Sequence, residues 1–314
     1  MVRSGRLILC LPVQHKGHGN FAGRRKEMKN LSKTKVIKGD NYMLETYIDP
    51  FNKRVRIDDF QGNVEKVIDE AERLADNLLA EKLIIKVRQE YFSDFLAHGF
   101  ICEAKLDQYF LGSDAYFFSK FFQIDRFINE HWIAENQTIE KILGQEKNLD
   151  KSKRQKDVAL RKAELSDAVL LSHLYSEVFP VYPTPLHDPD YVAKTIKQGT
   201  IYFCIKQEDT IVSAASAEIN HFYKNAELTD CATLMSHRKH GYVKLLLQRL
   251  EEELKRTGVF CAYSLSRAQS FGMNAAFYQL GYSYRGRLLN NCFIYSKLEN
   301  MNLWVKDLSR NQGK

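Results

Sequence analysis

The sequence lacks the patterns that mark several broad classes of protein. Its six cysteines are scattered without a C-x-x-C pair, which argues against both a zinc site and a disulfide framework. No window approaches the roughly 18 consecutive apolar residues of a membrane-spanning helix. The apolar run from Leu7 to Val13 is short, and no small-residue cleavage site follows it. These absences favour a reducing, cytoplasmic setting without a metal or a membrane partner.

Basic charge is concentrated at the start of the chain. The net charge is +7, yet residues 1–38 hold ten Lys or Arg against one acid, Glu27, and the remainder holds 36 basic and 38 acidic residues. Binding to nucleic acid needs cations clustered on a folded face or a functional tail, so we expect no nucleic-acid partner. Residues 1–34 are interpreted as a disordered or non-native extension, with Met28 as a candidate natural start.

The rest of the chain divides into two globular regions. With 314 residues and 44% apolar content, the chain is long enough for two domains of ordinary size. Residues 147–156 are charged and poor in apolar side chains, which predicts a solvated linker. We therefore expect an N-terminal α/β domain over residues 35–146 and a second domain over residues 157–308.

The most informative segment is a basic turn that contains a glycine. It reads Arg238-Lys239-His240-Gly241-Tyr242-Val243 and lies between a predicted strand at 227–234 and a predicted helix at 244–257. The first turn of a helix leaves backbone N–H groups unpaired and carries the positive end of the helix dipole. This turn is therefore a candidate phosphate site.

The spacing Arg-x-x-Gly-x-Val resembles the pyrophosphate loop of the GNAT superfamily of N-acetyltransferases. In that family the pattern is Gln or Arg, two residues of any type, Gly, one residue of any type, and then Gly or Ala. Downstream, residues 259–263 predict a buried strand, and residues 274–282 predict a helix ending at Gly281, in the order of the family's motifs. Val243 departs from the pattern, because the family has Gly or Ala at this position. Its β-branched side chain would limit how closely the backbone approaches the phosphate.

The upstream pattern fits the same fold. It predicts a strand at 158–163, helices at 165–178 and 191–197, and strands at 201–206 and 211–220. The resulting order, β-α-α-β-β-β-α-β-α-β, predicts an α/β fold of the GNAT type, a mixed sheet with flanking helices.

A similar order recurs in the N-terminal region. Strands are predicted near 54–57, 83–87 and 115–120, and helices at 64–80 and 91–98. We hypothesise that this smaller α/β domain is a degenerate GNAT-like copy that lacks the phosphate loop. The alternative is an unrelated α/β domain, because many such domains show this order.

The chemistry of acetyl transfer requires a base, since an amine with a pKa of roughly 10 must lose a proton to react. Several members of the family place a catalytic Glu at the position of Glu227, which makes it the candidate base; a surface carboxylate is the alternative. Tyr278 matches the family's catalytic Tyr and is the candidate acid; a core aromatic is the alternative. Asp230 should face away from Glu227 unless a bulge intervenes.

The resemblance also implies which residues bind acetyl-CoA, the expected co-substrate. Ala232, Thr233 and Leu234 would offer backbone groups to the acetyl carbonyl and the pantetheine arm, and Asn274 would hydrogen-bond pantetheine. The pyrophosphate would be bound by the loop and first helical turn: Arg238, Lys239, His240, Gly241, Tyr242, Val243 and Lys244.

Three stretches, 179–185, 227–234 and 290–306, are similar to the β-lysine N6-acetyltransferases. Those enzymes acetylate the terminal amine of β-lysine and give the compatible solute N6-acetyl-β-lysine. A diamino acid needs a cationic or hydrogen-bonding partner for its carboxylate and an acidic partner for its second ammonium. The candidate substrate-binding residues are Tyr182, Glu218, Asp230, Arg285, Arg287, Asn290 and Asn291.

Two other functions stay open at the level of sequence. The same chemistry could act on another small amine, such as a polyamine or lysine. The chain could also be a non-catalytic module that binds or senses acyl-CoA, although Glu227 and Tyr278 at the family's positions favour catalysis. The expected partners are a small-molecule amine and acetyl-CoA, and a homodimer is left open.

Overall fold

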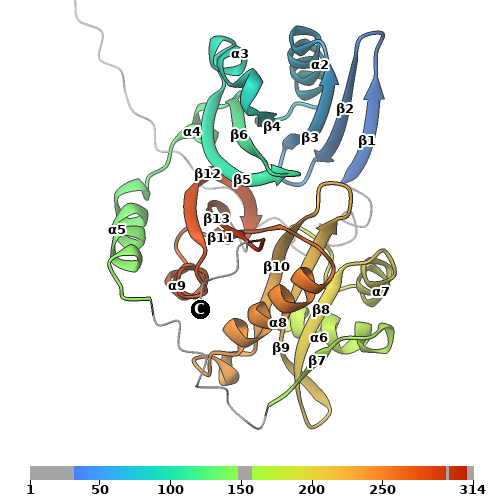
Figure 1. Cartoon of the computed structure of the whole chain (residues 1–314), viewed down its shortest axis with the longest axis vertical. Helices are drawn as coiled ribbons and strands as arrows, with labels where there is room; N and C mark the ends of the chain where they lie inside the picture. Colours follow the sequence, from blue (N-terminus) through green and yellow to red (C-terminus); the bar gives the residue numbers. More distant parts are fainter. Residues whose placement is uncertain (1–31, 148–157, 295–296, 310–314) are drawn as a thin grey trace, which may run out of the picture.

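The computed structural model describes residues 32–147, 158–294 and 297–309 (Figure 1). The expectations for residues 1–31 and for the linker at 148–156 lie outside the described residues. Lys33 and Thr34, which composition assigns to the extension, belong instead to the first strand. The described strands form one 13-stranded mixed sheet in the order β1-β2-β3-β4-β6-β5-β12-β13-β11-β10-β9-β8-β7.

The N-terminal half runs from the first strand to residue 143, and the C-terminal half begins at residue 158. The N-terminal elements are β1 (Lys33–Lys38), β2 (Tyr42–Asp49), β3 (Arg54–Gly62), α2 (Val64–Asn77), β4 (Lys82–Arg88), η2 (Gln89–Tyr91), α3 (Phe92–Ala97), β5 (Ile101–Phe110), β6 (Ser113–Phe121), α4 (Ile124–Phe127) and α5 (Trp132–Leu143). The C-terminal elements are β7 (Ala159–Lys162), η3 (Leu165–Asp167), α6 (Ala168–Val178), α7 (Pro189–Lys197), β8 (Ile201–Gln207), β9 (Thr210–Asn220), β10 (Asn225–Thr233), η4 (Met235–His237), α8 (Tyr242–Arg256), β11 (Cys261–Arg267), α9 (Phe271–Gln279), β12 (Ser283–Ile294) and β13 (Lys297–Asp307).

The strand order is symmetric about the contact between β5 and β12. Outward from that contact, β5-β6-β4-β3-β2 on one side corresponds to β12-β13-β11-β10-β9 on the other. Each half contains one parallel pair, β3 with β4 and β10 with β11, and a helix, α2 or α8, connects the two strands of the pair. The halves therefore share a topology, while the descent of the N-terminal half from a GNAT-like copy stays a hypothesis.

A close backbone approach joins the two halves. Gly286 of β12 pairs with Ala104 of β5, has φ of +128°, and a Cβ atom there would lie 2.4 Å from the Glu103 carbonyl oxygen. Beside this pair, the Lys82 ammonium lies 2.7 Å from the Glu103 carboxylate and donates to the Leu289 carbonyl at 2.8 Å. A glycine is required at position 286 because any larger residue would separate the strands.

The sheet curls so that its two halves face each other across an inner core. That core joins β4, β5 and β6 to β11, β12 and β13, with Phe117 and Tyr263 among its members. On the outer faces, α2 and α3 cover the N-terminal half and α8 and α9 cover the C-terminal half (Figure 1). Helices α6 and α7 pack on the inner face of β8 to β10, where Tyr175 and Tyr202 are buried.

The predicted strands and helices are present, with shifted ends. Strand β3 continues beyond the predicted span of 54–57 as far as Gly62 (φ +93°), which pairs with Tyr42. The C-terminal half ends in two long antiparallel strands, β12 and β13, one strand more than the predicted order. Helix α5, counted with the N-terminal domain, packs instead against α9.

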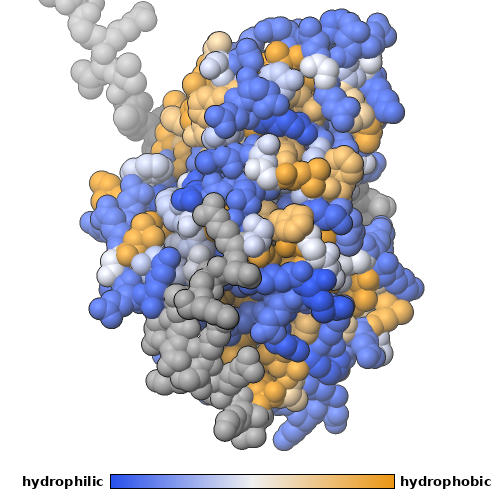
Figure 2. Space-filling model, in the orientation of Figure 1, coloured by the Kyte–Doolittle hydropathy of each residue, from blue (hydrophilic) through white to orange (hydrophobic). Residues whose placement is uncertain are grey.

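The surface shows no continuous apolar band on the face drawn in Figure 2, where separate apolar clusters interrupt a mainly hydrophilic surface. In the described ranges no helix has the length and apolar run needed to cross a membrane. No group of three or more His, Cys, Asp or Glu among those residues is arranged to hold a metal ion.

Candidate active site

The site begins where β10 and β11 separate. The two strands pair only from Asn225 to Glu227 on β10 and then diverge. An extra residue interrupts β10 at the same place: Thr229 faces Ser216 of β9 and Ala232 faces Ala214, which leaves Asp230 as a bulge with φ of +50°. A bulge bends its strand and redirects side chains. The separation opens a cavity of about 710 Å³ between β10, β11, α8, α9 and the end of α6.

The first turn of α8 forms one end of this cavity. Gly241 adopts φ of +74° immediately before the helix, and no side chain caps the helix start. Its first N–H groups are therefore open to an anion, with the helix dipole in the favourable direction. The loop residues that line the cavity are Arg238, Lys239, Gly241, Tyr242, Val243 and Lys244. His240 is exposed and stacks on Tyr242, with 5.5 Å between ring centroids.

Gly241→Ala is expected to raise the KM for acetyl-CoA several-fold, because a side chain at this positive φ strains the phosphate loop. The matched control is Gly258→Ala at the other end of α8: both glycines have φ of +74°, and neither would place a Cβ within 4 Å of another residue. Initial rates against acetyl-CoA concentration measure the effect. Equal KM values for acetyl-CoA in the two variants would show that the loop does not bind the coenzyme.

The three residues predicted to hold the acetyl and pantetheine groups differ in their position relative to the cavity. Thr233 lines the cavity. Ala232 is buried beside α6, and its carbonyl accepts from the Ser213 hydroxyl at 3.0 Å. The Leu234 N–H donates to the Val212 carbonyl at 3.0 Å. Thr233 is therefore the best placed of the three for coenzyme contact, and Val243 both lines the cavity and packs on the core beneath α8.

Asn274 has a structural position rather than the predicted contact with pantetheine. It is fully buried, and its side-chain oxygen accepts from Ser266 at 2.9 Å, Asn302 at 2.9 Å and Trp304 at 2.8 Å. Its amide nitrogen donates to the carbonyls of residues 267 and 270. Because both polar atoms are bonded inside the protein, the predicted role does not fit this position.

Tyr278 also faces away from the cavity. Its hydroxyl donates to the carbonyls of Leu143 and Gln145, each at 3.0 Å, at the end of α5. The lining of the cavity includes its neighbours Phe277 and Gln279 instead. The predicted role as general acid does not follow from this position. Neighbouring residues of a helix point about 100° apart, because a helix has 3.6 residues per turn, and so Tyr278 can face away from the cavity that its neighbours line.

Three carboxylates share the inner face of β9 and β10. Glu227 lies opposite Glu218 on β9 and beside Tyr263 on β11. The bulge turns Asp230 to this same face, as the sequence analysis allowed, and the Ser216 hydroxyl donates to it at 2.7 Å. Tyr182, which lines the large cavity, also hydrogen-bonds Asp230. The predicted residues Glu227, Glu218, Asp230 and Tyr182 thus lie together.

Burial and like charge disturb the titration of these acids. Burial raises the pKa of Asp230 to about 6, and the Glu227 charge adds to the rise, while bonds from Ser216 and Tyr182 oppose it. Desolvation by the surrounding protein raises the pKa of Glu218, and the negative charges of Asp230 and Glu227 add to the rise. Glu218 keeps contact with solvent, which weakens the effect through screening. The site therefore favours a bound cation, which would relieve this repulsion.

Asp230→Asn is expected to stabilise the protein more at pH 7 than at pH 4, by up to about 3 kcal/mol. An unfolded Asp ionises near pH 4, whereas folded Asp230 holds its proton to about pH 6. The folded wild type therefore binds more protons between these values and loses stability as pH rises. Urea unfolding at several pH values measures the difference. The exposed Asp209→Asn is the control, and a pH-independent difference for both variants would contradict the expectation.

Three of the remaining predicted residues tie the two halves together and lie outside the cavity. Arg287 is buried, donates to Asn302 at 2.8 Å and lies 3.3 Å from the Glu135 carboxylate. Asn290 donates to the carbonyls of residues 126 and 128. Arg285 pairs with Asp107 at 2.5 Å. None of these positions supports the predicted contact with the acceptor.

Asn291 lies instead in a small cavity between the halves, with Glu227 and Tyr263. Sequence reasoning missed the other polar members of that cavity, Arg54, Arg56 and Lys86 of the N-terminal half. They alternate along ordinary strands, and no local motif distinguishes them. The only signal available was the repeated element order of the two halves.

Comparison with known proteins identifies the family of the chain. Residues 169–282 match the acetyltransferase (GNAT) family, a range that contains the loop and most of the large cavity. The chain is 39% identical over 260 residues to the N-acetyltransferase YodP of Bacillus subtilis (strain 168), covering 83% of this chain and 94% of that protein. The chain belongs to the GNAT family of acetyltransferases.

Two further relatives of this GNAT acetyltransferase are named beta-lysine N(6)-acetyltransferase. The protein of Methanosarcina mazei is 33% identical over 270 residues, which cover 80% of this chain and 100% of that protein. The protein of Methanococcus maripaludis is 34% identical over 275 residues, which cover 87% of this chain and 98% of that protein. These matches extend well beyond residues 169–282, so both halves of the chain belong to the shared sequence.

The protein is an acetyl-CoA-dependent N-acetyltransferase. The described residues fit the co-substrate: the uncapped start of α8 suits the pyrophosphate, and the cavity continues from it to the gap between β10 and β11. Thr229, Thr233 and Ser264 line that gap, and their polar groups can hydrogen-bond the amides of the pantetheine arm.

Proposed function

We propose that this GNAT acetyltransferase acetylates the terminal amine of β-lysine and forms the compatible solute N6-acetyl-β-lysine. The observation that carries the proposal is the cluster of Glu218, Glu227 and Asp230 beside the gap between β10 and β11. A site with three clustered carboxylates suits an acceptor that carries more than one ammonium group. The two relatives that bear this enzyme name support the same acceptor.

Acetyl-CoA supplies the acetyl thioester. The loop from Arg238 to Lys244 would bind its pyrophosphate, with Gly241 giving the backbone close access. Thr233 would orient the chain that reaches the gap between the strands. These contacts would hold the reacting carbonyl at the face where the carboxylates lie, which reduces the entropy lost in reaching the reactive geometry.

Glu227 would act as the base. It would take a proton from the ammonium of the acceptor and leave the neutral amine that attacks the thioester. As the C–N bond forms and the C–S bond breaks, the nitrogen loses its second proton, and coenzyme A leaves as a thiolate that is protonated from solvent. Asp230 and Glu218 would hold the ammonium form of the acceptor before that transfer, and Tyr182 would keep Asp230 oriented through its hydrogen bond. The aromatic rings of Phe179 and Tyr182, stacked with centroids 4.6 Å apart, would cover the methylene chain of the acceptor.

An acceptor panel tests the proposed function. The purified protein is given acetyl-CoA with β-lysine, lysine or spermidine, and thiol release is measured against a control without amine. We expect the highest kcat/KM with β-lysine, and fragmentation of the product in a mass spectrometer should place the acetyl group on the terminal nitrogen. A preference for spermidine, or acetylation of the 3-amino group, would contradict the proposal.

A further inference from the structure

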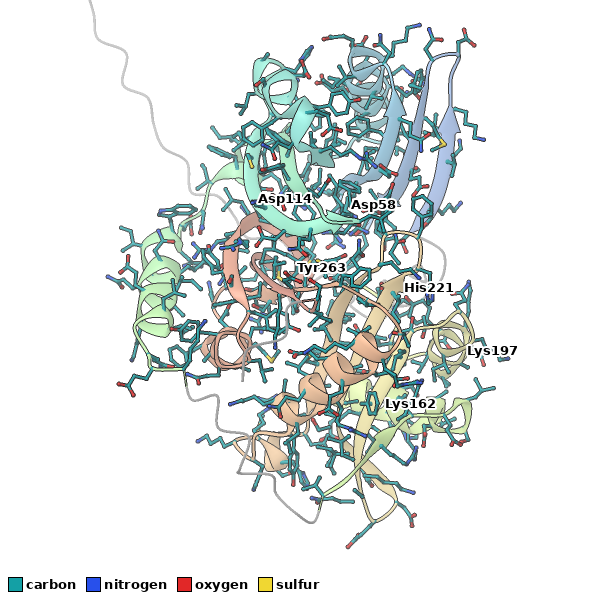
Figure 3. The ribbon with its side chains drawn as sticks, viewed as in Figure 1. Asp58, Asp114, Lys162, Lys197, His221 and Tyr263 are labelled. Atoms are coloured by element: carbon teal, nitrogen blue, oxygen red, sulfur yellow. The ribbon has the colours of Figure 1, made fainter. Side chains whose placement is uncertain are left out.

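The N-terminal half reaches the acceptor side of the site. A small cavity of about 10 Å³ between the halves is lined by Arg54, Arg56 and Lys86 of the N-terminal half and by Glu227, Tyr263 and Asn291 of the C-terminal half. Leu265 lines both this cavity and the large one, so the two lie beside the same side chain. Figure 3 shows Asp58 and Tyr263 near the boundary between the halves. The candidate base therefore faces residues from a different half of the chain.

The N-terminal wall of this cavity is positively charged. Arg56 makes a two-bond contact with the Asp58 carboxylate, at 2.6 and 3.0 Å, and the Lys86 ammonium lies 2.9 Å from the same carboxylate. Lys86 is buried and also donates to the Tyr109 hydroxyl at 2.8 Å. Two cations thus share one carboxylate, and the group of three carries a net charge of +1 next to the cavity.

The opposite wall carries Glu227, and Glu218 and Asp230 lie near it on the same inner face of β9 and β10. Between the two walls, Asn291 is buried, and its side-chain oxygen has no hydrogen-bond partner among the described residues. A buried acceptor without a donor is costly in a folded protein and points to a missing partner. An ammonium or amide N–H of a bound molecule would supply that donor.

We propose that Arg56 and Lys86 bind a carboxylate of the acceptor, while its reacting amine lies at Glu227. This inference rests on the proposed function and narrows it to amines that also carry a carboxylate, such as diamino acids, and excludes polyamines. A guanidinium recognises a carboxylate through strong, directed hydrogen bonds. The N-terminal half would then determine acceptor specificity, although the phosphate loop and the base belong to the C-terminal half.

The test compares acid and amide forms of the same acceptor in two variants. Arg56→Gln removes the guanidinium and leaves Asp58 paired with the Lys86 ammonium at 2.9 Å. Arg73→Gln is the matched control, because Arg73 makes a similar two-bond contact with Glu70, at 2.6 and 2.9 Å, on the half-exposed side of α2. The acceptors are β-lysine, β-lysine amide, lysine, lysine amide and spermidine, each at saturating acetyl-CoA.

The wild type should prefer each acid over its amide. The Arg56→Gln variant should lower kcat/KM for the acid about 10- to 100-fold, leave that for the amide nearly unchanged, and keep the KM for acetyl-CoA. Equal losses for acid and amide, or a wild type that does not discriminate between them, would overturn the inference. So would a preference for spermidine or turnover with no acceptor.

The same experiment separates this inference from the proposed function. If the wild type uses lysine rather than β-lysine, yet the acid preference is present and disappears in the variant, the β-lysine assignment fails and the carboxylate site stands. If β-lysine is the preferred acceptor but Arg56→Gln behaves like Arg73→Gln, the proposed function stands and the carboxylate site is wrong. Circular dichroism of each variant verifies that the fold is retained.

Discussion

Glu227→Gln is expected to lower kcat by about 10²- to 10⁴-fold while acetyl-CoA binding is retained. The amide has the shape of the carboxylate but cannot take a proton from the amine. Glu227 lies on the inner face of β10 and lines the small cavity between the halves, whereas the phosphate loop lines the large cavity at the start of α8. Single-turnover rates measure the chemical step, and titration with a non-reactive coenzyme analogue measures binding.

Glu218→Gln is the informative comparison, because Glu218 lies directly opposite Glu227 on the neighbouring strand. If Glu227 is the base and Glu218 contributes only charge, Glu218→Gln should change kcat much less and raise the KM for the amine. A Glu227→Gln variant that loses coenzyme binding together with turnover would point to a structural role for Glu227. Equal effects of the two substitutions on kcat would show that Glu227 and Glu218 act together as the base.

Lys82→Met is expected to lower the free energy of unfolding by about 3–5 kcal/mol, because it leaves a buried carboxylate without its cation. Lys82 and Glu103 are almost completely inaccessible to solvent, with side chains 0% and 2% exposed and 2.7 Å between the charged groups. Burial lowers the pKa of Lys82, and the Glu103 charge opposes that shift. Denaturant unfolding at neutral pH gives the free energy directly.

The combined variant Lys82→Met/Glu103→Gln tests this explanation. The glutamine oxygen can still accept from the Leu289 N–H, which lies 2.7 Å from the Glu103 carboxylate. The double variant should therefore be more stable than the sum of the single losses predicts. Lys53→Met is the control, since Lys53 pairs with Glu81 at the surface and has a side chain that is 58% exposed. Additive losses in the double variant would contradict a direct interaction.

Local patterns were sufficient to predict the elements that build the coenzyme end of the site. Gly241 before an amphipathic helix is a short-range signal, and the structure places it at the start of α8 with positive φ. The alternating strands and the helical period of α2 are equally local, and they predict β3, β4 and β6 but not β1, β2 and β5 of the N-terminal half. The placement of Glu227 on β10 follows from the strand alone.

Features that depend on long-range contacts could not be predicted. Regular alternation puts Glu227 and Asp230 on opposite faces, and the bulge that reverses this depends on the register between β9 and β10. Tyr278 matched a family position, yet its hydroxyl is bonded to the end of α5, a helix more than a hundred residues earlier in the chain. Arg56 and Lys86 reach the cavity only because the sheet curls.

The contact between β5 and β12 also has a consequence for the order in which the protein is made. The N-terminal half is complete at residue 143, whereas its partner strand, β12, begins only at residue 283. Domains commonly fold as they leave the ribosome, N-terminal part first. Until β12 is synthesised, the edge of β5 and the inner apolar face, including Phe117 and Leu106, would be open to other strands. The nascent chain is therefore most vulnerable to aggregation in the interval between these two strands, and a chaperone that covers a sheet edge would act there.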